Sequence, residues 1–287
     1  MSELVGVHGI AKHQLGRHQL LAAWTPALAD GLERALDREV AQPPLDLAFY
    51  GDVFLDPGRA GGGTGGVTKS AYSDTVSEGM DERELADVVE ALTETVSAED
   101  IALAEGAADK GRARMPRTVQ VLMRAIDRRF GSAAGVLAVG ALRQVRRYLH
   151  DGDVKARVDA RVEGTVGSKC RVLIGHSLGS VVAYEYLRRN PGHGVELLLT
   201  LGSPLGLRMV RRHLHVGALE VPAWVNVRDA RDPVACAGPL RTWWPQMGEG
   251  DEIVVENGAD AHAVERYLNR RATGEVLLGV LPHLGAA

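Results

Sequence analysis

The sequence has little of what would mark a disulfide scaffold, a metal centre, a membrane protein or a nucleic-acid binder. Its 287 residues include two cysteines, too few for a disulfide framework, and neither a C-x-x-C nor an H-E-x-x-H motif occurs. The formal net charge of −4 gives no general attraction for nucleic acid. No apolar run approaches the length of a membrane span. We expect no nucleic-acid partner, no bound metal and no organic cofactor.

The beginning of the chain also lacks targeting features. Residues 1–9 contain neither the basic segment nor the apolar segment that opens a secretory signal, and they enter a strand-like run almost at once. We expect a cytoplasmic protein. Cys170 begins the apolar run before the main motif described below, where a buried structural thiol is the default interpretation.

Short β-like runs alternate with helical segments along the chain. This alternation predicts an α/β fold, with a mostly parallel sheet of about six strands flanked by helices. Several runs are apolar throughout, as in strands that are buried on both faces. A helix is predicted to begin at Thr25, with Pro26 in its first turn. The predicted strands are residues 4–8, 45–50, 171–176, 195–201, 223–228 and 252–256.

The segment between the second and third predicted strands is much longer than a simple crossover needs. We expect residues 56–150 to form a helical cap or lid inserted into a core made of residues 1–55 and 151–287. The insertion contains a glycine-rich stretch, residues 61–66, with the composition of a flexible loop. A second core helix is predicted over about residues 153–162.

The insertion is divided by charge. Residues 73–109 are acidic, whereas residues 110–150 carry nine arginines and a single acid. We expect the two halves to pair with each other. The alternative is that the arginines attract an anionic substrate or an anionic membrane surface.

The segment Gly175-His176-Ser177-Leu178-Gly179 is the only G-x-S-x-G match in the chain. A strand-like run precedes it and a helix-like run follows it, which is the setting that this motif needs. A serine on such a sharp turn is exposed at the end of the sheet, and the glycines let strand and helix approach closely. We predict that Ser177 is a nucleophile rather than part of an ordinary turn.

A serine nucleophile needs a base and an acid that orients the base, in the chain order serine, acid, histidine. Asp232 follows the fifth predicted strand, and Pro233 stiffens the turn beside it. Asp229 is the rival acid, and either carboxylate could simply cap the turn. His262 follows the last predicted strand and is the predicted base, with His283 as a weaker candidate.

The predicted oxyanion donors are two backbone N–H groups. Leu178 supplies one from the turn itself. Ile10 supplies the other, after Gly9 at the end of the first predicted strand; the alternative is a plain turn between strand and helix. His213 and His215 have the spacing of a metal-binding pair, but no supporting cysteine or acid spacing is present, so surface positions are favoured.

With these residues placed, the chain resembles the α/β-hydrolase superfamily, and within it the lipase/serine-esterase-like branch. The resemblance covers about residues 4–50 and 153–268 and does not cover the insertion. No strand pair precedes Leu4, unlike in many members of the family. The segments that carry the resemblance are Val7-His8-Gly9, Gly175–Gly179, Leu201-Gly202-Ser203-Pro204-Leu205, Asp232-Pro233-Val234 and His262.

The resemblance implies an α/β-hydrolase fold and the cleavage of a carboxylic ester through an acyl-serine, but it does not choose the substrate. We expect a small-molecule ester or acyl substrate with an apolar acyl group. An acyltransferase, a thioesterase or a cyclase would use the same three side chains. A hydrolase-like scaffold that only binds a ligand is the non-enzymatic alternative.

Overall fold

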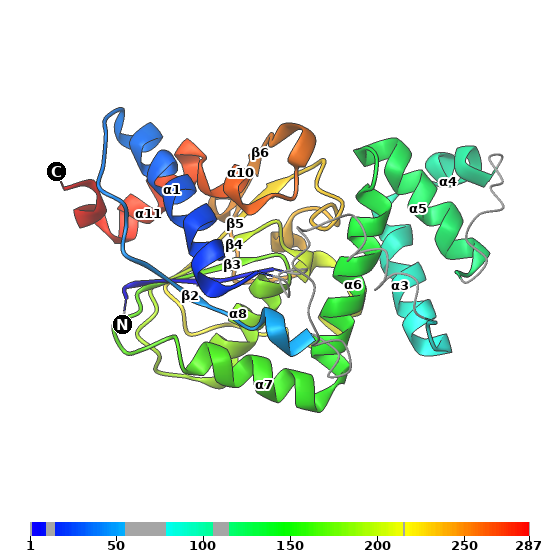
Figure 1. The fold of residues 1–287 in the computed structure, drawn as a ribbon, viewed down its shortest axis with the longest axis horizontal. Coiled ribbons are helices and arrows are strands. Elements are labelled where there is room, and N and C mark those ends of the chain that lie inside the picture. The colour runs from blue at the N-terminus through cyan, green and yellow to red at the C-terminus, as the bar shows by residue number, and fades with distance from the viewer. Residues whose placement is uncertain (1, 10–14, 55–78, 106–114, 215, 287) are drawn as a thin grey trace.

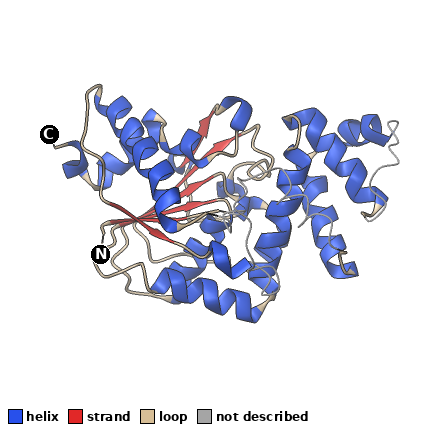
Figure 2. Cartoon of the chain, viewed as in Figure 1, coloured by secondary structure: helices blue, strands red, loops and turns tan. Residues whose placement is uncertain are grey.

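The computed structural model describes residues 2–9, 15–54, 79–105, 115–214 and 216–286. Its centre is a six-stranded sheet in which every neighbouring pair is parallel, in the order β2-β1-β3-β4-β5-β6 (Figures 1 and 2). The predicted α/β class and all six predicted strands are confirmed. Each observed strand begins and ends within two residues of its predicted bounds. The strands are β1 Leu4–Val7, β2 Leu45–Ala48, β3 Val172–His176, β4 Leu197–Leu201, β5 Ala223–Asp229 and β6 Glu252–Val255.

The burial of the central strands explains their largely apolar sequences. Every residue of β1, β3 and β4 is buried, so both faces of these strands need apolar or small side chains. The register aligns Val7 with Gly175, and His176 with Leu201. The loops that follow β1, β3 and β4 therefore begin side by side at one edge of the sheet.

Helices cover both faces of the sheet (Figure 1). On one face, α1 packs against α10 and α11. The α1–α11 contact is very close, because a Cβ atom at Gly274 would lie 2.2 Å from the carbonyl oxygen of Gly31. The other face carries α7 and α8. These helices are α1 Arg17–Leu36, α7 Gly152–Glu163, α8 Leu178–Arg189, α10 Val264–Leu268 and α11 Arg271–Val280.

The predicted start of the first helix at Thr25 is wrong. Helix α1 begins eight residues earlier and keeps Pro26 in its interior. A proline there removes one hydrogen bond and crowds the preceding turn, at a cost of about 3 kcal/mol. Leu20 and Trp24 lie in those earlier turns and are buried. Burial of two such side chains, at about 1.5–3 kcal/mol each, offsets the cost of the proline.

Among the residues described between β2 and α7, four α-helices sit together at one side of the sheet, away from both termini (Figure 1). Their buried side chains, such as Leu92, Leu122 and Val139, belong to the same apolar cluster as Leu178 and Leu205 of the sheet region. The glycine-rich residues 61–66 lie outside the described residues. The four helices are α3 Glu82–Thr95, α4 Ala98–Glu105, α5 Arg117–Phe130 and α6 Ala134–His150.

The acidic and basic halves of this region pair with each other as predicted. The Nε of Arg143 donates to Glu84 at 2.6 Å, and the Nε of Arg146 donates to Asp87 at 2.8 Å, which ties α6 to α3. Within the described part of the chain, no helix combines the length and apolar character needed to cross a membrane. The short helix α9 (Arg208–His213) follows β4 and packs on α3.

Candidate active site

Ser177 stands on a strained turn between β3 and α8. Its backbone has φ 55° and ψ −127°, which costs a residue with a side chain about 1–3 kcal/mol. The two glycines of the motif are required by contact. A Cβ atom at Gly179 would lie 2.0 Å from the carbonyl oxygen of Val7, and one at Gly175 would lie 2.6 Å from the Cα of Ser180. The turn therefore presses α8 directly against the ends of β1 and β3.

The structure brings Ser177, His262 and Asp232 into one chain of hydrogen bonds. The Nε2 of His262 lies 3.0 Å from the Ser177 hydroxyl oxygen, and its Nδ1 lies 2.8 Å from Oδ2 of Asp232. A carboxylate can only accept, so Nδ1 carries the proton and Nε2 is free to accept the proton of the serine. Ser177 and Asp232 are fully buried and His262 is 8% exposed.

Tyr267 holds the Asp232 carboxylate in place. Its hydroxyl donates to Oδ2 at 2.7 Å, while the backbone N–H of Val234 donates to Oδ1 at 2.8 Å. Burial, reinforced by the negative charge of Asp232, keeps the pKa of Tyr267 well above its ordinary value. The hydroxyl is therefore a permanent donor. Sequence reasoning missed Tyr267; its only signal was a tyrosine on the helix that follows His262.

The rival acid has a different role. The carboxylate of Asp229 accepts hydrogen bonds from the backbone N–H groups of Asn257 and, at 2.7 Å, of Arg231. It therefore joins the ends of β5 and β6, as a capping residue would. His283, the weaker candidate for the base, pairs with Glu3 at 2.9 Å, at the start of β1 and thus at the opposite edge of the sheet.

Two further residues shape the surroundings of the histidine, and sequence reasoning gave neither of them this role. The Nε2 of His176 lies 2.9 Å from the carbonyl oxygen of His262, and the two rings are 4.8 Å apart. Gly202 has φ 55°, and a Cβ atom there would lie 2.8 Å from Oδ2 of Asp232. The loop after β4 can run past the carboxylate only because residue 202 is glycine.

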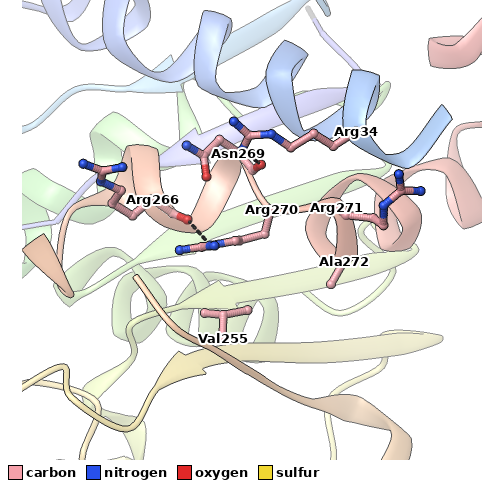
Figure 3. Close-up of a pocket in the computed structure, with 7 residues that line it drawn as sticks. All are labelled: Arg34, Val255, Arg266, Asn269, Arg270, Arg271 and Ala272. Atoms are coloured by element: carbon pink, nitrogen blue, oxygen red, sulfur yellow. Dashed lines mark hydrogen bonds between the residues drawn. The ribbon is translucent and has the colours of Figure 1, made fainter. Parts of the chain in front are cut away.

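Hydrogen bonds from Asn257 hold the loop that carries His262. The side-chain amide of Asn257 donates to the carbonyl oxygen of Ala261 at 2.9 Å and accepts from the Nε of Arg270 at 3.1 Å. Arg270 also lines a pocket of about 450 Å³ among α1, β6, α10 and the start of α11 (Figure 3). The other residues around this pocket are Arg34, Val255, Arg266, Asn269, Arg271 and Ala272.

Only one of the two predicted oxyanion donors falls in the described part of the chain. Leu178 is the first residue of α8, where N–H groups have no partner within the helix. Ile10 lies outside the described residues. The loop just before it is well fixed, since the backbone N–H of Tyr50 donates to Nε2 of His8 at 3.1 Å. A Cβ atom at Gly9 would lie 2.7 Å from the Cβ of Ser177, so this loop runs directly beside the serine.

Comparisons of the chain with protein-family models, with curated proteins and with solved structures found no match.

Residues of other predicted roles lie apart from this chain of hydrogen bonds. Burial raises the pKa of Cys170 and of Cys236 to about 12, so neither thiol is a nucleophile at neutral pH. Trp244 is buried and its ring packs against that of Tyr184, with the ring centroids 4.7 Å apart. Trp243 is 41% exposed beneath the guanidinium of Arg211.

Proposed function

We propose that the chain is a serine hydrolase of the α/β-hydrolase superfamily, which cleaves a carboxylic ester through an acyl-serine intermediate. The observation that carries the proposal is the unbroken sequence of hydrogen bonds from Ser177 through His262 to Asp232. The strained serine turn and the fully parallel sheet support the same assignment.

In the first half of the reaction, the Ser177 oxygen attacks the acyl carbon of the ester while its proton passes to Nε2 of His262. Asp232 orients the imidazole and stabilises the imidazolium. The tetrahedral intermediate then collapses as its C–O bond to the alcohol breaks, and His262 returns the proton to the departing alkoxide. The products are an acyl-serine and a free alcohol.

In the second half, His262 removes a proton from water as the water oxygen attacks the acyl-serine. Collapse of this second intermediate releases the carboxylic acid and returns the proton to Ser177. The negative oxygen in both intermediates needs hydrogen-bond donors. We assign one to the Leu178 N–H at the start of α8, where the helix dipole also favours negative charge, and the other to the N–H of Ile10.

Helices α3–α6 are the proposed cap of this site. Helix α3 meets the segment that follows β4, where the carboxylate of Glu94 accepts from the backbone N–H of Arg208 at 3.2 Å. The near-complete burial of Ser177 and His262 favours a second candidate function. If the acyl-serine forms in a site that excludes water, an alcohol, amine or thiol acceptor would replace water, giving an acyltransferase or a cyclase.

The proposal is tested by intact-mass analysis after treatment with a fluorophosphonate probe, which labels activated serines. We expect one adduct per chain, lost in Ser177→Ala and retained in Ser168→Ala, an exposed serine remote from the site. Labelling of Ser177→Ala would refute the assignment of the nucleophile. Absence of labelling in the natural chain would favour the binding scaffold.

A series of p-nitrophenyl esters, from acetate to palmitate, then gives the preferred acyl length. Release of free acid supports the hydrolase. A new ester or amide, formed when an alcohol or amine acceptor is added, supports acyl transfer instead.

A further inference from the structure

Three side chains of metal-ligand type meet at a place remote from Ser177 in the chain: Asp87, His150 and His213. One ligand atom from each lies within 4.8 Å of the other two. The imidazole rings of His150 and His213 have centroids 4.1 Å apart, and Nε2 of His150 lies 3.9 Å from Oδ2 of Asp87. Each residue comes from a different helix: α3, α6 and α9.

We propose that Asp87, His150 and His213 form a binding site for a divalent transition-metal ion, with zinc as the best fit. Two imidazoles and one carboxylate, with a fourth position left for water, form a ligand set that suits Zn²⁺. Bonds of about 2.0–2.2 Å require neighbouring ligand atoms to be about 3.3 Å apart in a tetrahedral site. The ligand atoms must therefore approach one another by about 1.5 Å at most, and those of His150 and Asp87 by only about 0.6 Å.

The two histidines are free to make this movement. Both are exposed, and each is the last residue of its helix, so its side chain can rotate without disturbing a packed interior. The negative end of the dipole of α6, a helix of 17 residues, lies at His150 and also favours a cation there.

The carboxylate of Asp87 is already bound by two guanidiniums, which is the main objection to the site. Arg146 donates to Oδ2 at 2.8 Å and Arg212 to Oδ1 at 2.9 Å. Each carboxylate oxygen has a second lone pair, so both hydrogen bonds can persist when a metal binds. Donors of this kind orient a ligating carboxylate.

The positive charge of the two arginines is offset by further acids. Arg146 also lies 3.9 Å from Asp81, and Arg212 lies 2.8 Å from Glu90. Arg208 lies 3.7 Å from the same Glu90, so three carboxylates, Asp87 included, face three guanidiniums. The ion pairs around the imidazoles are therefore balanced in charge before a cation binds.

The proposed ion has a structural consequence. It would link α3 and α6 to α9, which directly follows the β4 end of the sheet, and so fasten the helical region to the sheet region. The site does not depend on the proposed hydrolase activity, since none of its ligands belongs to the Ser177–His262–Asp232 chain.

The test is calorimetric titration of the full-length chain with Zn²⁺ after dialysis against a chelator, repeated with Co²⁺ to record its visible spectrum. We expect one ion per chain and the intense absorption of four-coordinate Co²⁺. His150→Gln and His213→Gln should each weaken binding by at least about tenfold. His18→Gln, which changes an exposed histidine on α1, should bind as the natural chain does.

Thermal unfolding provides the second readout. Zn²⁺ should raise the Tm of the natural chain and of His18→Gln, and should leave the Tm of His150→Gln unchanged. The proposal is overturned if no ion binds. It is equally overturned if the two glutamine variants bind Zn²⁺ as tightly as the natural chain, because the ion would then lie elsewhere.

Discussion

The Ser177 turn and the contact between α3 and α9 are held together by different forces. At the turn, glycine backbone touches backbone, and the polar groups are buried and hydrogen-bonded to one another. At the α3–α9 contact, Arg212 pairs with Asp87 and Glu90 although 47% of its side chain is exposed. Such charges are screened over about 8 Å at physiological salt.

This difference indicates which part of the molecule can adjust. Close-packed backbone has no nearby alternative arrangement, so the turn keeps the serine in a fixed position. Exposed ion pairs are worth about 0–1 kcal/mol each and can be exchanged for contacts with water or ions. The ion pairs at this contact can therefore rearrange at low cost while the reacting groups stay in place, although α3 and α9 also share a buried apolar cluster that includes Leu92 and Met209.

The largest expected effect concerns the acid in the rigid region. Asp232→Asn should lower kcat by about 10³–10⁴-fold, since an amide does not fix the histidine in the required protonation state. Asp229→Asn, the matched control, should keep kcat within about tenfold, because its carboxylate binds backbone N–H groups instead. The kcat of ester hydrolysis is measured for both variants. A larger loss in Asp229→Asn would reverse the roles of the two acids.

The packing of the turn is tested by adding one methyl group. Gly179→Ala places a Cβ atom against the carbonyl oxygen of Val7 and should lower the free energy of unfolding by about 3 kcal/mol or more. Gly152→Ala is the control: nothing lies within 4 Å of its added methyl group, and it starts a helix. Urea unfolding compares the two. Equal stability of both variants would mean that the turn is not rigid.

A smaller effect is expected from Tyr267→Phe, which removes one donor to Asp232 and leaves the N–H of Asp229 without its acceptor. The free energy of unfolding should fall by about 1–3 kcal/mol, and kcat should fall while KM stays the same. Tyr186→Phe changes another buried tyrosine, farther along α8, and should leave kcat unaltered. An unchanged kcat in Tyr267→Phe would remove its positioning role.

The smallest effect belongs to the helical region. The backbone N–H and hydroxyl of Ser97, together with Arg129, hold the pKa of the Asp100 carboxyl at about 2. Because this pKa is lower than the ordinary 3.8, Asp100 stabilises the folded chain above about pH 4, and the contribution disappears as the pH falls through 2.

Unfolding of the natural chain and of Asp100→Asn, compared from pH 2 to pH 6, should differ by less than about 1 kcal/mol, and only at the upper end of this range. A difference that is as large at pH 2 as at pH 6 would show that the carboxylate charge is not its source.

The sequence predicts the sheet well because its strands are short apolar runs whose burial leaves few alternatives. It fails at the start of α1, where Pro26 signals a helix boundary locally but buried Trp24 decides the outcome through tertiary packing. The proximity of Ser177, Asp232 and His262 could be predicted from the sequence because each residue follows a strand. Parallel strands end at the same edge of the sheet, so the three residues come together there.

The supporting residues could not be predicted in the same way. Tyr267 reaches Asp232 across 35 positions of the chain, and Asp87 meets His213 only through the packing of α3 on α9. No local periodicity encodes such contacts. The pairing of α3 with α6 is different, because the sequence places α3 in an acidic segment and α6 in a basic one. Opposite charges on two segments attract without an exact register between their residues.

The suppressed thiol reactivity of Cys170 and Cys236 has a practical consequence. Because burial raises both pKa values to about 12, maleimide and nitroxide reagents should leave the two native cysteines unmodified at neutral pH. Cysteines introduced on the exposed faces of α3 and α9 can then carry a pair of spin labels or fluorophores in the otherwise natural chain. The separation of such a pair, followed molecule by molecule, would record directly how often the two helices part.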